Sequence, residues 1–181
     1  MIITKIAQIT QRIIQKSKPT REIYLQQIAD AASDGTSRST LSCGNLAHGM
    51  ASCNATDKEM LAGEKVANLA IINSYNDMLS AHQPYAKYPE LIKNVAARQG
   101  VTAQVAGGVP AMCDGITQGQ AGMELSLFSR DLIAMSTAVS LSHNMFDGVL
   151  CLGVCDKIVP GMLIGALSFG HLPTVFYLQG P

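Results

Sequence analysis

From residue 66 onwards, apolar and polar positions form blocks that predict four strands alternating with three helices. Short apolar runs are typical of buried strands, whereas apolar residues at every third or fourth position indicate helices. The expected strands are residues 66–73, 101–106, 148–154 and 174–178, and the expected helices are residues 84–98, 126–143 and 162–169. Consecutive strands joined by helices lie parallel through right-handed crossovers. The order therefore predicts an α/β fold, a parallel sheet with helices on both faces; a mixed sheet is the alternative.

The helical pattern of residues 126–143 also predicts which of its side chains are buried. Apolar residues recur along one side of this segment at helical spacing. The positions expected to be buried are Leu127, Leu132, Met135, Val139 and Leu141. Ser126 or Ser129 is expected to cap the first turn, because a serine hydroxyl can accept a hydrogen bond from a free backbone N–H group there.

Residues 1–65 are expected to form amino-terminal helices and a long loop, ahead of the α/β domain at residues 66–181. Isoleucines recur at helical spacing through residues 1–18 among basic residues, which indicates an amphipathic helix. A transit peptide is the alternative interpretation. The segment is poor in serine and arginine and has no cleavage signal, so we favour a helix that packs on the body or on a second subunit.

A proline divides this amino-terminal extension. Pro19 is expected to end the first helix, and Thr20 is expected to cap a second helix at residues 21–32. Residues 33–57 are rich in Ser, Gly, Asn and Thr and show no periodicity. We expect them to form a long loop, and loops of this length are usually functional or lie over a site.

Polar side chains follow three of the predicted strands at the points where those strands end. They belong to residues 73–77, 107–114 and 155–157. The carboxyl ends of parallel strands share one edge, where open α/β sheets bind their ligands. Thiolates suit iron–sulfur clusters or zinc, whereas carboxylates suit magnesium or manganese. The pattern predicts a metal site at this edge, with further ligands from elsewhere because one cysteine cannot hold a cluster.

Cys155 is the leading candidate for a functional side chain at this edge. It is flanked by Asp156 and Lys157 at the end of a buried strand, a setting that can activate a thiol. A structural role is the alternative. Cys151 lies inside the same strand and is expected to be part of the core. His82, near the end of the first strand, is the histidine best placed to reach the site.

The composition narrows the choice of partners. Of the 181 residues, 48% are hydrophobic and only 14% are charged, with 13 basic residues balancing 13 acidic ones. This balance favours neither nucleic acid nor a membrane surface, and no apolar run reaches the roughly 18 residues of a membrane span. Five cysteines without a framework spacing indicate reduced thiols in a cytoplasmic protein. The low charge favours a second buried surface, and we expect a homodimer.

Several segments resemble the dihydroxy-acid and 6-phosphogluconate dehydratase family. Residues 155–162, reading Cys-Asp-Lys-Ile-Val-Pro-Gly-Met, resemble a signature of that family, and residues 73–77 and 114–130 match it in order and spacing. Residues 40–48 and the amino-terminal extension are similar to the 6-phosphogluconate dehydratase branch. The resemblance covers nearly the whole chain, which we expect to be the amino-terminal part of a longer enzyme. The uncovered apolar strand at 174–178 agrees with this expectation.

The resemblance implies a reaction, the dehydration of 6-phospho-D-gluconate to 2-dehydro-3-deoxy-6-phospho-D-gluconate in the Entner–Doudoroff pathway. The enzyme would be a hydro-lyase that carries an oxygen-sensitive 4Fe-4S cluster. In the family the catalytic base is a serine in the carboxyl-terminal part, and another cluster cysteine also lies there. Both would lie beyond Pro181, so the resemblance implies that residues 1–181 contain no catalytic residue and are inactive alone.

The resemblance also assigns roles to residues of this chain. Cys155 would be one cluster ligand. Asp114, Asp156 and Lys157 match positions that bind Mg²⁺ in dihydroxy-acid dehydratases, where the lysine is carbamylated. A carbamate can coordinate a metal ion that an ammonium group would repel. Weaker candidates for contact with the substrate are Asn73, Ser74 and His82.

The chain departs from the dihydroxy-acid dehydratase pattern at one position. Those enzymes often add a cluster cysteine shortly after the Asn-Ser motif, where this chain has Ala81 followed by His82. The departure argues against a two-iron cluster and against a branched-chain substrate. A dihydroxy-acid dehydratase remains the first alternative function. A non-catalytic module that binds a sugar phosphate or forms a dimer is the second.

Overall fold

The computed structural model describes residues 2–33, 37–62 and 66–178. The chain divides into two compact units, Met1–Gly35 and Thr36–Pro181, and each is described by itself. The second unit contains the whole sheet together with the short helices that precede it.

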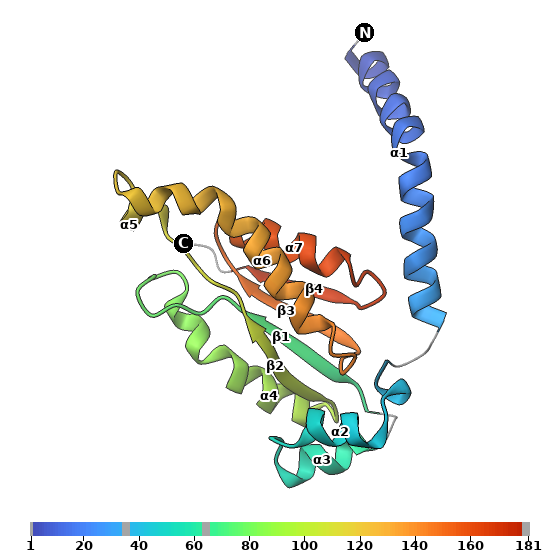
Figure 1. Cartoon of the computed structure of the whole chain (residues 1–181), viewed down its shortest axis with the longest axis vertical. Helices are drawn as coiled ribbons and strands as arrows, with labels where there is room; N and C mark the ends of the chain where they lie inside the picture. The colour runs from blue at the N-terminus through green and yellow to red at the C-terminus, as the bar shows by residue number, and fades with distance from the viewer. Residues whose placement is uncertain (1, 34–36, 63–65, 179–181) are drawn as a thin grey trace. The chain divides into compact units, whose positions relative to one another are not determined.

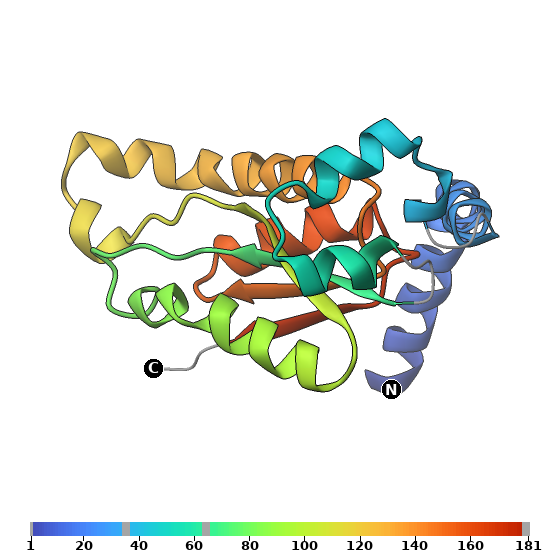
Figure 2. The same ribbon diagram turned by 90° about the horizontal axis from the view of Figure 1, so that it is seen from below.

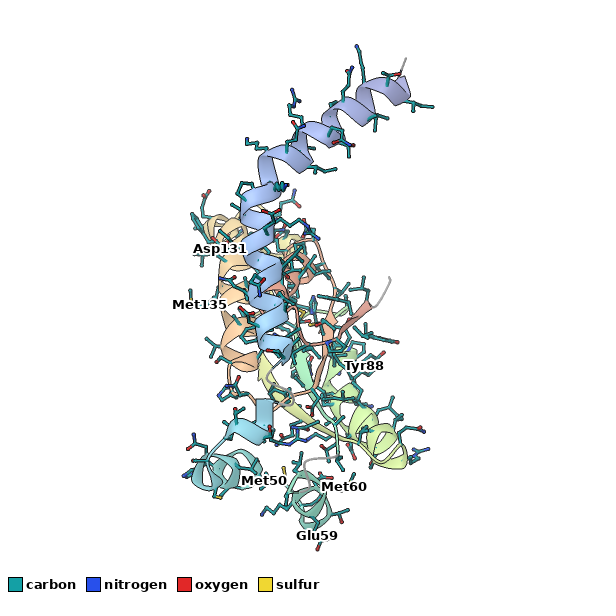
Figure 3. The ribbon with its side chains drawn as sticks, turned by 90° about the vertical axis from the view of Figure 1, so that its right-hand side faces the viewer. Met50, Glu59, Met60, Tyr88, Asp131 and Met135 are labelled. Carbon is teal, nitrogen blue, oxygen red and sulfur yellow. The ribbon has the colours of Figure 1, made fainter. Side chains whose placement is uncertain are left out.

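The first unit is a single helix, α1 (Ile2–Ser33), which continues through Pro19. The prediction that Pro19 ends one helix and Thr20 caps the next is therefore wrong. Proline removes one backbone hydrogen bond and bends a helix without having to end it, and Figure 3 shows α1 changing direction partway along. Thr20 does not cap a second helix. Its Oγ1 donates a hydrogen bond to the carbonyl oxygen of Ser17, one turn earlier in the same helix, at 2.9 Å. Neither α1 nor any other helix of the described residues has the length and apolar character needed to cross a membrane.

Four parallel strands form the sheet of the second unit, which confirms the predicted α/β class (Figure 1). The strands are β1 (Asn68–Asn73), β2 (Thr102–Gly108), β3 (Gly148–Gly153) and β4 (Thr174–Leu178). Their spatial order is β2-β1-β3-β4, and every neighbouring pair is parallel. All four lie where the apolar runs of the sequence placed them, because a strand covered on both faces needs an apolar run.

Helices cover both faces of the sheet (Figure 2). Helix α4 (Tyr88–Arg98) lies on one face, and α6 (Ser126–Leu141) and α7 (Ile158–Leu167) lie on the other. Successive strand residues point to opposite faces of the sheet, so they are buried in two separate hydrophobic cores. Ile72 and Cys151 belong to the core beneath α6 and α7, whereas Ile71 and Leu152 belong to the core beneath α4. The expectation that Cys151 is a core residue is confirmed, and burial raises the pKa of its thiol to about 12.

Helix α6 buries a different side from the one that its apolar spacing predicted. Leu141 is buried as expected, but Leu132, Met135 and Val139 are exposed. Figure 3 shows Met135 on the outer side of α6, where 67% of the residue is exposed. Besides Leu141, the apolar residue of α6 that enters the core is Ile133, which is 0% exposed. Apolar residues occupy two sides of this helix, so spacing alone could not tell which side is covered.

Close packing of α6 against α7 explains which side of α6 is covered. Gly161 and Gly165 of α7 face α6 without side chains. A Cβ atom on Gly165 would lie 2.5 Å from the carbonyl oxygen of Ala134, and one on Gly161 would lie 2.8 Å from Cβ of Ile133. The backbones can approach this closely only because both positions are glycine.

The start of α6 also differs from the prediction. The helix follows Leu125, and no side chain caps it. Ser129 Oγ donates to the carbonyl oxygen of Ser126 at 2.7 Å, and Ser126 Oγ donates to Oδ1 of Asp114 at 2.6 Å. Ser126 thereby supports the carboxyl edge of the sheet instead of capping its own helix. The side chain of Leu127 lies outside the described residues.

Residues 37–57, which belong to the segment predicted as a long loop, are mostly helical, and residues 34–36 lie outside the described residues. They contain a 3-10 helix at Ser37–Thr40, helix α2 (Cys43–Met50) and the start of α3 (Ala55–Ala62). Ser42 Oγ accepts a hydrogen bond from the N–H group of Asn45 at 3.2 Å. Asn54 Oδ1 accepts one from the N–H group of Asp57 at 2.8 Å. Such caps allow short helices to form in a polar segment that has no apolar periodicity.

Candidate metal centre at the carboxyl edge of the sheet

Three loops meet at the carboxyl edge of the sheet (Figure 2). They follow β1, β2 and β3 and contain residues 74–77, 109–114 and 154–157. The N–H group of Ser74 donates to the carbonyl oxygen of Leu152 at 3.1 Å, which joins the first loop to β3. Asn76 Nδ2 donates to the carbonyl oxygen of Ala111 at 3.2 Å, which joins the first loop to the second. The parallel topology therefore brings the three predicted polar segments together.

A charged cluster links the second and third loops. Lys157 Nζ donates closely to Oδ2 of Asp114 and also donates to Oδ1 of Asp156 at 3.1 Å. Ser126 Oγ donates to the other oxygen of Asp114 at 2.6 Å. The Lys157 side chain is mostly buried, whereas Asp156 points into solvent with 81% of its side chain exposed. Two carboxylates thus converge on one cationic atom at a partly open position.

The charges in this cluster shift the pKa values of its members. The hydrogen bond from Lys157 is the main reason that the pKa of Asp114 is lowered, and the hydrogen bond from Ser126 adds to it. The hydrogen bond to Asp114 is likewise the main reason that the pKa of Lys157 is raised, and Asp156 adds to it. Without a metal ion, Lys157 is therefore an ammonium group held between two carboxylates.

Cys155 adopts a backbone conformation that a side chain rarely takes. Its φ is 80°, in the left-handed region that favours glycine. Backbone strain of this kind costs about 1–3 kcal/mol and is concentrated at functional sites. The residue is exposed, and the pKa of its thiol is raised by partial burial first and then by the nearby Cys113 and Asp156. The turn therefore presents a protonated thiol at the edge, and metal binding would deprotonate it.

His82 fixes one side of the Cys155 thiol. Its Nε2 lies 3.5 Å from Sγ of Cys155, and its Nδ1 lies 2.8 Å from the carbonyl oxygen of Ser74. A carbonyl oxygen only accepts hydrogen bonds, so Nδ1 carries the proton and Nε2 offers a lone pair to the thiol. Burial lowers the pKa of His82, which keeps the ring neutral. The imidazole is 1% exposed, so it supports the thiol from inside the protein.

Asn73 and Ser74, the weaker substrate candidates, are both engaged within the protein. Asn73 Nδ2 donates to the carbonyl oxygen of Tyr85 at 3.0 Å, and its Oδ1 accepts from the N–H group of Tyr75 at 2.9 Å. Ser74 Oγ donates to the carbonyl oxygen of Leu152 at 2.8 Å and is fully buried. In the described structure both side chains shape the first loop.

The side chains at this edge are of the types that would bind the iron–sulfur cluster and the Mg²⁺ ion implied by the resemblance. They do not supply all the ligands of either one. Among the described residues, no three His, Cys, Asp or Glu side chains are grouped so that they could hold a metal ion alone. Asp114 and Asp156 nevertheless already surround a cationic atom, Nζ of Lys157. A carbamate on this nitrogen would add oxygen donors of the kind that Mg²⁺ prefers. Cys155 offers an exposed thiol of the kind that iron–sulfur clusters require.

Two residues of this edge were not singled out from the sequence. Ser126 was expected to cap a helix, and its bond to Asp114 appears only when α6 and the second loop are placed in space. Cys113 lies within the predicted polar segment at residues 107–114, but no role was assigned to it. A signal for it existed, because the dipeptide Cys-Asp occurs twice in the chain, each time after a predicted strand.

A family model describes the same region of the chain. The model for the amino-terminal part of dihydroxy-acid/6-phosphogluconate dehydratases matches residues 67–181. The chain belongs to this family. The match begins just before β1 and includes all three loops of the carboxyl edge, so the geometry described above lies within the dehydratase family region. The family resemblance stated from the sequence is thereby confirmed.

Relatives of this dehydratase family extend the similarity to almost the whole chain. A phosphogluconate dehydratase of Rhizobium meliloti is 63% identical over 178 residues, which are 98% of this chain and 29% of that protein. One of Pseudomonas aeruginosa is 61% identical over 177 residues, again 98% of this chain and 29% of that protein. A dihydroxy-acid dehydratase of Akkermansia muciniphila is 43% identical over 113 residues, 62% of this chain and 20% of that protein. The chain thus spans less than a third of the length of these relatives.

Proposed function

We propose that this chain forms the amino-terminal part of a hydro-lyase that dehydrates 6-phospho-D-gluconate to 2-dehydro-3-deoxy-6-phospho-D-gluconate. The observation that carries the proposal is the exposed Cys155 thiol, presented from a strained turn beside the cluster of Asp114, Asp156 and Lys157. Similarity of about 60% across 98% of the chain to proteins named phosphogluconate dehydratase supports the substrate. A dihydroxy-acid dehydratase has weaker support, from 43% identity over 62% of the chain.

The residues of the carboxyl edge suit a reaction that removes water from a sugar acid. When bound, a 4Fe-4S cluster supplies a Lewis-acidic iron for the leaving hydroxyl group, and Mg²⁺ neutralises the charge that develops next to the substrate carboxylate. Cys155 would hold the cluster, and Asp114, Asp156 and Lys157 would hold Mg²⁺. His82 orients the thiol from beneath, and Ser126 holds Asp114 in position.

Lys157 can serve the metal-free and the metal-bound states without changing the charge of the site. The ammonium group and two carboxylates together carry one net negative charge. A carbamate, two carboxylates and Mg²⁺ together also carry one net negative charge. Asp114 and Asp156 therefore keep the same electrostatic balance when carbamylated Lys157 and a divalent cation replace the ammonium group, and this supports a metal site at these residues.

We expect residues 1–181 alone to be inactive, since the family's catalytic base belongs to the carboxyl-terminal part. The assay is a dehydratase measurement on this chain after anaerobic reconstitution with iron and sulfide. Turnover of 6-phospho-D-gluconate would contradict the proposal that another segment completes the site.

The main test uses the protein extended to the length of its phosphogluconate dehydratase relatives. After anaerobic reconstitution, we expect bound iron and sulfide and preference for 6-phospho-D-gluconate over a branched-chain dihydroxy acid. Cys155→Ser should abolish the visible absorbance of the cluster, whereas Cys151→Ser should keep it because Cys151 is a core residue. Preference for the branched-chain substrate would favour the dihydroxy-acid dehydratase alternative. Absence of iron and sulfide from the intact protein would favour a non-catalytic binding or dimerisation module.

The proposal also includes a cytoplasmic homodimer that binds a small sugar-acid phosphate and neither nucleic acid nor membrane. Zero formal net charge supports the absence of a polyanion partner. Free cysteines support a reducing compartment. Sedimentation of the purified protein tests the dimer.

A further inference from the structure

The five cysteines of the chain have different surroundings. Cys151 is buried inside β3, Cys43 begins α2, and Cys53 accepts a hydrogen bond from Nε2 of Gln104 at 3.2 Å. Only Cys113 and Cys155 lie in loops at the carboxyl edge of the sheet. The two loops are joined, because Lys157, two residues after Cys155, donates from Nζ to Oδ2 of Asp114, the residue after Cys113. The site described above therefore contains a second thiol, which has no assigned role.

The two cysteines lie in loops that follow β2 and β3, the two strands on either side of β1. Cys113 precedes Asp114 after β2, and Cys155 precedes Asp156 after β3, so each loop carries the dipeptide Cys-Asp. Both aspartates contact Lys157 Nζ. A residue next to each cysteine is therefore fastened to the same cationic atom, which holds the two cysteine backbones on either side of one charged cluster.

The backbone of Cys113 is fixed, but its thiol remains available. Its carbonyl oxygen accepts hydrogen bonds from the N–H groups of Ile116 at 3.1 Å and Thr117 at 3.2 Å, which start α5 (Asp114–Thr117). The Sγ atom passes beside Gly115, where a Cβ atom would lie 3.5 Å away. Cys113 is half-buried and forms no disulfide. A fixed backbone with a free thiol is what a metal ligand needs.

We propose that Cys113 is a second cluster ligand from this chain, beside Cys155. The inference rests on the proposed iron–sulfur function. One cysteine cannot hold a cluster, and Ala81 leaves the first loop without a thiol. Cys113 supplies a thiol from the second loop instead. In each Cys-Asp dipeptide, the thiol would then bind the cluster and the carboxylate would bind the divalent cation.

The test uses three variants of the protein extended to the length of its relatives: Cys113→Ser, Cys155→Ser and Cys53→Ser. Cys53 is the matched control, because it is half-buried like Cys113 but lies outside the edge. After anaerobic reconstitution, iron and acid-labile sulfide per chain should fall to a small fraction of the wild-type content in Cys113→Ser and Cys155→Ser, because each variant lacks a cluster ligand. Cys53→Ser should keep the wild-type content and absorbance.

A second measurement on the wild-type protein avoids any effect of substitution on folding. The reconstituted protein is treated with iodoacetamide before and after a chelator removes the iron, and labelled cysteines are identified by peptide mass spectrometry. Cys113 and Cys155 should be protected until the iron is removed, whereas exposed Cys43 should react in both states. Wild-type iron content in Cys113→Ser, or labelling of Cys113 while iron is bound, would overturn the inference and leave the proposed function standing. A wild-type protein that binds no iron would overturn both.

Discussion

The two ends of the parallel sheet treat charged side chains in opposite ways. At the amino edge, Arg38 pairs with Asp147 at 2.9 Å, and only 3% of the Arg38 side chain is exposed. At the carboxyl edge, Lys157 also pairs with carboxylates, but one of them, Asp156, is largely exposed. The same kinds of charge are enclosed at one end and open at the other. The amino edge therefore encloses its charges, whereas the carboxyl edge leaves charged groups accessible to a ligand.

At the amino edge, the side chains of Arg38 and Asn68 form hydrogen bonds within the protein. Arg38 Nη1 donates to the carbonyl oxygen of Met145 at 3.3 Å, and Nη2 donates to that of Val66. Asn68 donates from its N–H group to Oδ2 of Asp147 at 2.7 Å and from Nδ2 to the carbonyl oxygen of Met145 at 3.0 Å. A network bonded in this way fixes the start of the sheet and leaves little capacity to bind a ligand.

The carboxyl edge has a buried layer of side chains and an exposed layer above it. Ser74 and His82 are buried and bonded to each other, as at the amino edge. Above them, Cys155 is exposed in a strained backbone conformation, and Asp114 and Asp156 keep oxygen atoms accessible. Side chains that are fixed from beneath and open above are suited to hold a ligand that comes from outside this part of the chain.

Removing the charge of Arg38 should give the largest loss of stability. Arg38→Met would leave the partly buried Asp147 carboxylate without its cation, and breaking a buried pair on one side costs about 3–5 kcal/mol. The measurement is the free energy of unfolding in urea. As a control, Lys18→Met removes a cation from an exposed pair with Glu22, at 3.7 Å, and should cost about 0–1 kcal/mol. Equal losses in both variants would contradict the structural role of the amino edge.

Ser74→Ala should give a smaller loss, because both partners of the hydroxyl group keep another hydrogen bond. His82 Nδ1 lies 3.1 Å from Oγ of Ser74 but also 2.8 Å from the carbonyl oxygen of Ser74. The hydroxyl group donates to the carbonyl oxygen of Leu152 at 2.8 Å, but this oxygen also accepts from the N–H group of Ser74. We expect a cost of about 0.5–1.5 kcal/mol, the range for losing hydrogen bonds whose partners stay bonded. Ser136→Ala, which removes an exposed hydroxyl group from α6, should change stability by less than about 0.5 kcal/mol. If Ser74→Ala lowered the free energy of unfolding as much as Arg38→Met, the two edges would contribute equally to stability, which would contradict the comparison.

Much of the sheet could be predicted from the sequence, because the apolar runs of β1 to β4 are local signals. The meeting of three loops at one edge followed from the parallel order alone. Helix α6 was harder: Leu132 and Ile133 are both apolar, and only the packing of α7 decides that Ile133 is the buried one. Pro19 was misleading because a proline can bend a long helix without ending it.

The candidate site could be predicted in its residue types but not in its contacts. Cys155, Asp114 and Lys157 are recognisable from their positions after strands and from the family resemblance. The bond between Ser126 and Asp114 joins a helix start to a distant loop, and no local pattern encodes it. The proton position on His82 likewise depends on the carbonyl oxygen of Ser74, which is known only from the folded structure.

The pH dependence of stability should carry a contribution from His82. Burial lowers the pKa of the folded histidine below the ordinary value of 6.5. As the pH falls below 6.5, the unfolded chain takes up a proton that the folded chain does not, so the free energy of unfolding decreases until the folded pKa is reached. In the metal-free, reduced protein, His82→Gln should remove this decrease, whereas His48→Gln, on the exposed side of α2, should keep it. An unchanged pH profile in His82→Gln would mean that the imidazole is not held neutral beneath Cys155.

Asp156→Asn should have the smallest effect on stability and therefore separates the two edges most sharply. The side chain is 81% exposed, and its single contact with Lys157 can be kept by the amide oxygen, so the free energy of unfolding should change by less than about 0.5 kcal/mol. The same substitution removes one carboxylate from the proposed cation site. In the protein of full family length, the Mg²⁺ concentration for half-maximal activity should rise at least about tenfold. A loss of stability above about 1 kcal/mol with unchanged Mg²⁺ dependence would make Asp156 a structural residue like Arg38, and the carboxyl edge would then be a second stabilising end of the sheet instead of a metal centre.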